Sequence, residues 1–202
     1  MGCDRTAILL IASLALPRPA AAQAADRPVR LGAVVAPVTS GEFDSIHAGI
    51  GVQATWLPVP LVGADVEVVI HPADLGADPA FSSGSVETFF GVTVGPRIGR
   101  WRPFAKVRPG IIRYWQSPEP IACITIFPTP VQCTLASGRT VAAFDFGGGV
   151  ERIVSDRVFV RLDAADRMLA FPGPVRDGSG TAHEDGYFAH DLRFAVSVGV
   201  MF

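Results

Sequence analysis

The chain has 202 residues, which is enough for one domain with a core of its own after an N-terminal leader is set aside. Hydrophobic residues make up 49% of it, yet no stretch approaches the roughly 18 apolar residues of a spanning helix. The formal net charge of -2 provides no basic surface for nucleic acid, so we expect no nucleic-acid partner.

The N-terminus has the pattern of a secretory signal peptide, residues 1–24. A short polar start containing Arg5 precedes a ten-residue apolar run at 7–16, and small residues at 20–24 favour cleavage. The mature domain is therefore predicted to cover residues 25–202, and it is directed out of the cytoplasm.

Alternation with a period of two predicts eight strands in the mature chain. Their ranges are 29–37, 46–57, 61–71, 84–98, 101–115, 139–154, 157–170 and 187–202. Three tight connections, at 58–60, 99–100 and 155–156, alternate with four longer loops at about 38–45, 72–83, 116–138 and 171–186. Eight strands close a small barrel, and this asymmetry of connections is typical of bacterial outer-membrane barrels. We expect an all-β, eight-stranded antiparallel up-and-down transmembrane β-barrel in the outer membrane, with both termini periplasmic.

The charges select which face of each strand lines the lumen, the interior of the barrel. In strand 101–115, Lys106 and Arg108 alternate with Ala105 and Val107. The opposite register would place each such cation in lipid, at a cost of about 2 to 4 kcal/mol near the midplane. The predicted lumen charge network comprises Asp65, Glu67, Glu87, Arg97, Lys106, Arg108, Asp145, Glu151, Arg161, Asp163 and Arg193. Arg30, Arg102, Arg157 and Asp191 share the inward face.

Acids and bases nearly balance on this inward face, and an uncompensated buried charge would cost several kcal/mol. The side chains of an eight-stranded barrel also just fill its interior. We therefore predict a hydrated lumen plugged by charged side chains, with inward glycines such as Gly91 and Gly147 giving the arginines room. A soluble barrel of lipocalin type, with its apolar face inward, is the less favoured alternative. The scarcity of lysine counts against it.

Two cysteines, Cys123 and Cys133, lie in the loop 116–138 and are expected to form a disulfide outside the cytoplasm. Closing this short loop contributes roughly 2.5 to 3 kcal/mol in the chain-entropy model. The disulfide would stiffen a surface protrusion used for contact, or protect a long loop from proteases.

Segment 143–151, the turn Ser155-Asp156-Arg157 and the strand 160–163 that follows resemble the sixth and seventh strands of the small outer-membrane β-barrel family, which includes the OmpA membrane domain. In that family the barrel-assembly machinery recognises the terminal strand. The resemblance implies this role here for the alternating residues Phe194, Val196, Val198, Val200 and Phe202.

The sequence predicts no catalytic residue, cofactor or metal site. His47, His71, His183 and His190 are all expected at the outer rim, and no histidine pairs with a serine on adjacent outward positions. A structural or surface-interaction role through the long loops is the leading hypothesis. A narrow channel for small solutes or ions is the alternative, and a lipid A-modifying enzyme is less favoured. We expect a monomer whose partners are outer-membrane lipids and, during biogenesis, the assembly machinery. No ligand of the loops is identified.

Overall fold

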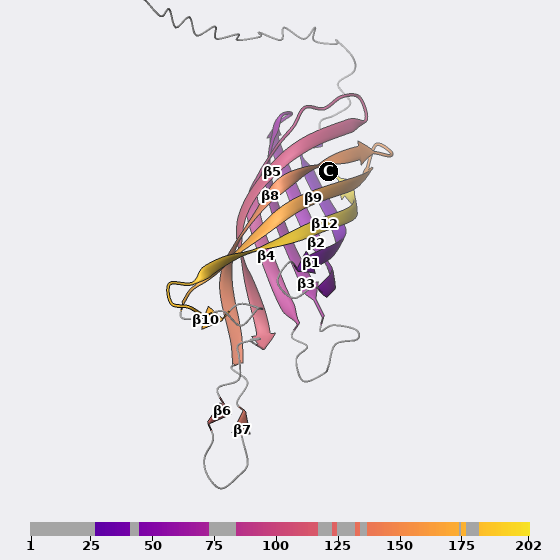
Figure 1. Ribbon diagram of the computed structural model, residues 1–202. Helices are drawn as coiled ribbons and strands as arrows, with labels where there is room; N and C mark the ends of the chain where they lie inside the picture. The colour runs from indigo at the N-terminus through magenta and orange to yellow at the C-terminus, as the bar shows by residue number, and fades with distance from the viewer. Residues whose placement is uncertain are drawn as a thin grey trace, which may run out of the picture.

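The computed structural model describes residues 27–40, 45–72, 84–116, 123–124, 132–133, 137–173, 175–176 and 182–202, and its main feature is a closed barrel of eight antiparallel strands (Figure 1). The strands are β1 (Val29–Ser40), β2 (Ser45–Val59), β3 (Val62–His71), β4 (Ser85–Val94), β5 (Trp101–Gln116), β8 (Ser137–Ile153), β9 (Val158–Phe171) and β12 (Tyr187–Met201). Around the barrel they follow the order β1-β12-β9-β8-β5-β4-β3-β2. This order confirms the predicted up-and-down topology. The predicted signal peptide lies outside the described residues.

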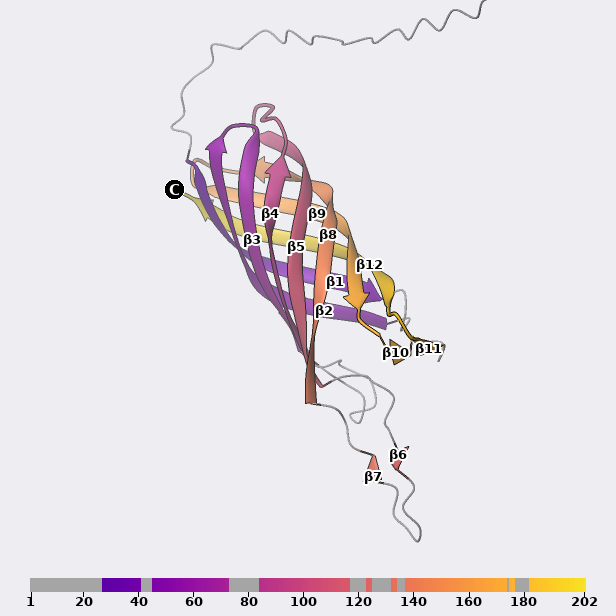
Figure 2. The same ribbon diagram turned by 90° about the vertical axis from the view of Figure 1, so that its left-hand side faces the viewer.

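Two short strand pairs lie in the long connections. β6 (Cys123–Ile124) pairs with β7 (Gln132–Cys133), and β10 (Val175–Arg176) pairs with β11 (Ala182–His183). Both pairs lie at the end of the barrel away from the C-terminus (Figure 2). We call this end the loop rim, and we call the opposite end, where the tight turns lie, the turn rim. Among the described residues, no helix is long and apolar enough to cross a membrane.

The barrel closes where the first strand meets the last. β1 and β12 pair antiparallel, with Gly32 opposite Gly199. At the turn rim the Phe202 N–H donates to the Val29 carbonyl at 2.8 Å. The first and last strands therefore begin and end at the same rim, and the closed ring leaves no strand edge unpaired along this seam.

Prolines decide where the ladder between β4 and β5 stops. The ladder ends with Val94 opposite Ala105, and in the same register Pro96 would face Pro103. Neither proline has a backbone N–H, so the pairing cannot continue between them. The predicted strand 84–98 is therefore wrong at its C-terminal end, because β4 ends at Val94.

The apolar face of the strands points outward, as predicted. Large apolar side chains such as Val35 and Val107 are exposed on the outer wall, while Lys106 and Arg108 on either side of Val107 are buried. The aromatic residues of the predicted apolar face are also exposed: Trp56, Phe90, Phe144, Phe146, Phe194 and Phe202. A barrel of lipocalin type would have the reverse arrangement, so the structure excludes that alternative.

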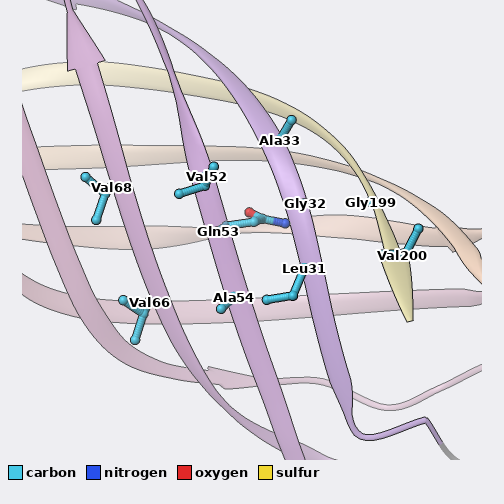
Figure 3. Close-up of a pocket in the computed structure, with 10 residues that line it drawn as sticks. All are labelled: Leu31, Gly32, Ala33, Val52, Gln53, Ala54, Val66, Val68, Gly199 and Val200. Carbon is cyan, nitrogen blue, oxygen red and sulfur yellow. The ribbon is translucent and has the colours of Figure 1, made fainter. Parts of the chain in front are cut away.

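Small outward residues leave a groove in this apolar wall. Ala33 and Ala54 lie between larger neighbours such as Leu31, Val52 and Val66, and together they line a groove of about 410 Å³ over β1, β2, β3 and β12 (Figure 3). Its lining is almost entirely apolar. The groove therefore belongs to the surface that avoids water.

The interior is filled in layers along the barrel axis. Toward the loop rim, six buried apolar residues pack together, with three partly buried aromatics against them: Phe89, Ile112, Val141, Ala143, Leu169 and Ala189, then Tyr114, Phe171 and Tyr187. Charged residues occupy the middle and the turn-rim half. The two sets of residues meet at Glu87, which lies opposite Ile112 in the β4–β5 ladder.

Inward glycines make room for these charged side chains. A Cβ added at Gly91 would lie 2.7 Å from the Arg108 Cα and 2.9 Å from its Cγ. A Cβ added at Gly149 would lie 2.6 Å from the Asp163 Cβ. The added Cβ would also lie 2.1 Å from the Val107 carbonyl oxygen at Gly91 and 2.2 Å from the Leu162 carbonyl oxygen at Gly149. A larger residue at either position would therefore displace the neighbouring strand together with its charged residue.

Candidate functional site

Almost all of the predicted lumen charge network is buried inside the barrel. Ten of its eleven members are described as buried: Asp65, Glu67, Glu87, Lys106, Arg108, Asp145, Glu151, Arg161, Asp163 and Arg193. They come from six strands, β3, β4, β5, β8, β9 and β12. Alternation turns their side chains inward, and closure of the barrel brings them together.

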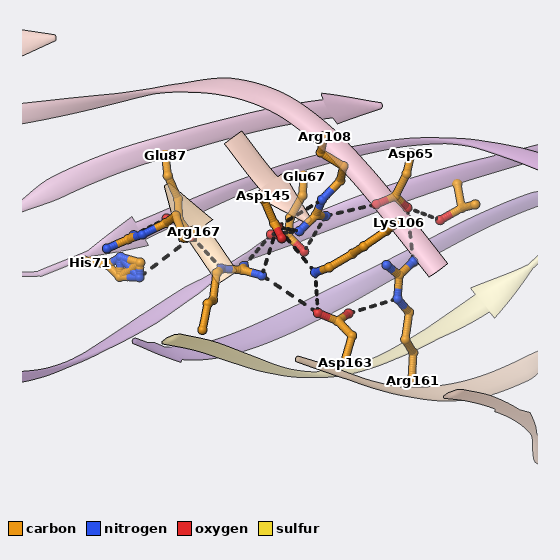
Figure 4. A network of polar contacts seen from close by, with 12 residues as sticks. Asp65, Glu67, His71, Glu87, Lys106, Arg108, Asp145, Arg161, Asp163 and Arg167 are labelled. Atoms are coloured by element: carbon orange, nitrogen blue, oxygen red, sulfur yellow. Dashed lines mark hydrogen bonds and ion pairs between the residues drawn. The ribbon is translucent and has the colours of Figure 1, made fainter. Parts of the chain in front are cut away.

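Arg108 is at the centre of this network (Figure 4). Its Nη1 lies 2.9 Å from Asp65 Oδ2 and 3.3 Å from Glu67 Oε2. Its Nη2 forms a further ion pair with Asp145. One guanidinium group thus forms ion pairs with three carboxylates. Its several N–H donors, held in one plane, are suited to such charge-assisted hydrogen bonds.

Two ion pairs cross the full width of the lumen. Arg161 on β9 reaches Asp65 on β3 at 3.1 Å. Arg193 on β12 reaches Glu87 on β4, also at 3.1 Å. In each case the two strands are four places apart in a ring of eight, so they lie directly opposite one another. Side chains therefore bridge the barrel from wall to wall.

Lysine and aspartate complete the middle layer. Lys106 Nζ lies 2.5 Å from Asp163 Oδ1 and 3.3 Å from Asp145 Oδ2. Arg161 Nε lies 3.1 Å from the other oxygen of Asp163. Each acid in this layer thus contacts at least one cation, which is the condition for burying so many charges together.

Arg167 is a member of the network that the sequence prediction missed. It is buried, and it donates to Glu87 Oε2 at 2.7 Å and to Asp191 Oδ2 at 2.5 Å. The signal was present in the sequence, because Arg167 lies on the same face of β9 as Arg161 and Asp163. It joins the middle layer to the apolar residues toward the loop rim.

The prediction of an inward side chain is wrong for two arginines. Arg97 is exposed, and its Nε donates to the Gly99 carbonyl at 3.2 Å. The reason is the early end of β4 at Val94, which leaves Arg97 in the connection to β5, next to the bridge between Ile98 and Trp101 at the turn rim. Arg157 is also exposed, because it lies in the turn before β9 begins at Val158. Neither contributes charge to the lumen.

The turn-rim part of the lumen has a different arrangement. Arg30 forms a buried ion pair with Glu151. Arg102 is buried, and among the described residues it donates one hydrogen bond, to Thr93 Oγ1 at 3.3 Å, and lies 5.8 Å from the centre of the Phe104 ring. This layer therefore has more cations than acids.

His47, His71 and His190 lie in the loop-rim part of their strands, as expected. His71, expected at the rim, is buried with its Nε2 3.9 Å from Glu87 Oε1. His190 lies on the outer wall, with Nδ1 2.9 Å from Asp166 Oδ2, and the His183 ring lies 4.9 Å from the Tyr187 ring. Within the described part of the chain, no cluster of three or more metal-ligating side chains occurs.

The other predicted sites have defined positions. The proposed assembly residues, Phe194, Val196, Val198, Val200 and Phe202, are exposed on the outer wall of β12 and at its end. Cys123 is opposite Cys133 in the β6–β7 register. That register brings the two backbones side by side, and the disulfide itself stays a prediction.

Comparison with known proteins agrees with the fold. Neisserial surface protein A matches with a TM-score of 0.55 and 14% identity, covering 86% of this chain and 96% of that chain. The N-terminal β-barrel domain of Pseudomonas aeruginosa OprF gives a TM-score of 0.45 and 10% identity over 86% of this chain and 97% of that one. No family model matches the sequence, and no curated protein does either. The fold is that of the small eight-stranded outer-membrane barrels, as the resemblance implied.

Proposed function

We propose that this protein is a bacterial outer-membrane β-barrel whose lumen is closed by the charge network and whose long loops form a contact surface outside the cell. The observation that carries the closed lumen is the pair of cross-barrel ion pairs, Arg161 with Asp65 and Arg193 with Glu87. Side chains that join opposite walls obstruct the path of a solute at that level, which supports the closed lumen.

The outer wall supports the membrane location. Exposed valines, leucines and aromatics cover it on all sides of the barrel, and an exposed apolar surface of this extent would aggregate in water. Two charged residues on the outward phase, Arg113 and Arg152, lie toward the strand ends, where lipid gives way to headgroups. Asp166 lies nearer the middle of β9, and it pairs there with His190 at 2.9 Å on the outer wall. Outer-membrane lipids are thus the proposed partners of the wall.

The asymmetry of the two rims supports the orientation. The turn rim holds both ends of the barrel domain and only short connections, so we place it on the periplasmic side. The loop rim, with β6, β7, β10 and β11, then faces outward. In this arrangement the exposed stripe of β12 is available to the barrel-assembly machinery, and the closed ring needs no second copy.

Two measurements test the proposal. Gel migration before and after heating tests the membrane barrel, because a folded barrel in detergent migrates differently from the heated chain. A protein that remains soluble without detergent would contradict the membrane location.

Planar-bilayer recording tests the closed lumen. We expect no steady single-channel current from the unchanged protein. The double variant Arg161→Ser with Arg193→Ser removes both cross-barrel cations and should admit small currents. Arg113→Ser, an exposed arginine that bonds Thr140 at 3.3 Å, is the matched control and should stay silent. Steady currents from the unchanged protein, altered by Arg108 or Glu67 substitution, would instead establish a narrow channel.

A further inference from the structure

The buried charges are balanced over the whole lumen but not layer by layer. Among the side chains that the structure describes, buried cations and buried acids each number seven: Arg30, Arg102, Lys106, Arg108, Arg161, Arg167 and Arg193 against Asp65, Glu67, Glu87, Asp145, Glu151, Asp163 and Asp191. Near the loop rim, Arg167 serves both Glu87 and Asp191. Near the turn rim, Arg30 and Arg102 lie beside one acid, Glu151, while the neighbouring Arg161 and Asp65 form an ion pair with each other at 3.1 Å. The turn-rim layer therefore holds one positive charge in excess.

Arg102 carries this excess charge. It is buried, with 2% of its surface exposed, and its one protein hydrogen bond is the 3.3 Å contact with Thr93. Its Nε and Nη1 have no acceptor among the residues described. Glu151 is its direct cross-strand neighbour, but the Glu151 carboxylate is engaged by Arg30 from β1. A buried charged donor without a partner is destabilising, so this position needs an acceptor.

Two further arginines close to Arg102 also have unpartnered donors. Arg30 Nε and Arg161 Nη2 also lack an acceptor within the described structure. Arg161 is opposite Glu151 on β9, as Arg102 is on β5, and both guanidinium groups lie over the Phe104 ring, at 4.3 and 5.8 Å. Three arginines thus present free N–H groups around one carboxylate and one aromatic ring.

We propose that the turn-rim layer of the lumen binds one small monovalent inorganic anion of the chloride class, held by Arg102 with Arg30 and Arg161. The excess of a single charge selects a monovalent ion. The narrow interior, further filled by Phe104 and Phe159, selects a small one. Such an anion accepts the free N–H groups and neutralises Arg102. The proposed anion site depends on the geometry of the lumen and not on the absence of conductance. A barrel that conducts ions would therefore not contradict the site.

Anomalous diffraction from crystals of the full protein grown in sodium bromide tests the site directly. We expect a bromide peak within hydrogen-bond distance of the Arg102 guanidinium. The peak should vanish in Arg102→Gln and persist in Arg152→Gln, a matched control whose arginine is exposed on the outer wall over Trp101. Bromide at exposed arginines alone, or only a water-like density beside Arg102, overturns the proposal. If Arg102→Gln does not fold, the map of the unchanged protein decides.

Unfolding equilibria in chloride and gluconate, at one ionic strength, give the solution test. Binding to the folded state alone lowers the apparent unfolding constant about tenfold for each tenfold rise in chloride above the dissociation constant. We expect this dependence in the unchanged protein and in Arg152→Gln, and its loss in Arg102→Gln. A chloride dependence that is equal in all three proteins overturns the assignment to Arg102.

Discussion

Replacing Arg108 by methionine should destabilise the barrel by about 3 to 5 kcal/mol, the usual effect of breaking a buried ion pair from one side. Arg108 contacts Asp65, Glu67 and Asp145. After its removal, these acids and Asp163 share only three cations in the middle layer, namely Lys106, Arg161 and Arg193. One acid is thus left buried without compensation, while the methionine retains most of the volume.

A compensating change should recover part of this loss. Asp145→Leu removes the acid that Arg108 faces across the β5–β8 ladder, and Lys106 keeps Asp163 at 2.5 Å. The double variant should therefore cost less than the sum of the two single variants, by about 0.5 to 3 kcal/mol, as expected for groups in contact. Urea unfolding in phospholipid vesicles measures this, followed by the fluorescence of the exposed tryptophans Trp56, Trp101 and Trp115.

A control variant distinguishes the effect of losing a direct contact with Arg108 from the effect of changing the net charge of the lumen. Glu151→Gln also removes one negative charge from the lumen, but the ion pair of Glu151 is with Arg30 at the turn rim. Arg108→Met with Glu151→Gln should thus show no such recovery. Equal recovery of stability by both double variants would mean that only the overall neutrality of the lumen matters. A loss of unfolding free energy below about 0.5 kcal/mol in Arg108→Met would refute the network as a source of stability.

Three further predictions concern the positions of single residues. Arg167→Met should lower the free energy of urea unfolding by about 3 to 5 kcal/mol, because Arg167 is buried, while the exposed Arg97→Gln should change it by no more than about 0.5 kcal/mol. Equal effects would contradict the buried position of Arg167 and the exposed position of Arg97. Val107→Arg places a cation on the lipid face and should cost about 2 to 4 kcal/mol in vesicles, against a small effect for Val107→Leu. Thiol labelling without reductant should detect neither Cys123 nor Cys133, and Cys123→Ser should expose one reactive thiol, whereas labelling of both in the unchanged protein would exclude the disulfide.

Much of the barrel could be predicted from local patterns. Alternation located all eight strands to within a few residues, because one face of each strand carries charge and the other carries large apolar groups. The boundary of β4 was missed, since the facing of Pro96 and Pro103 depends on the register between two strands. That single error also misplaced Arg97. Arg167 was also missed, although its phase along β9 indicated an inward side chain.

The sequence by itself determined the fold class, the lumen side of each strand and the near equality of buried charges, because these follow from a period of two and the high cost of charge in lipid. Only the tertiary structure decided which charges meet. Arg193 and Glu87 are 106 residues apart and pair because barrel closure places β12 opposite β4. The same closure leaves Arg102 without an ion pair in the described part of the chain, although Glu151 is beside it, because Arg30 reaches that carboxylate from another strand. Pairing across a lumen depends on strand order and stagger around the ring, which no local pattern contains.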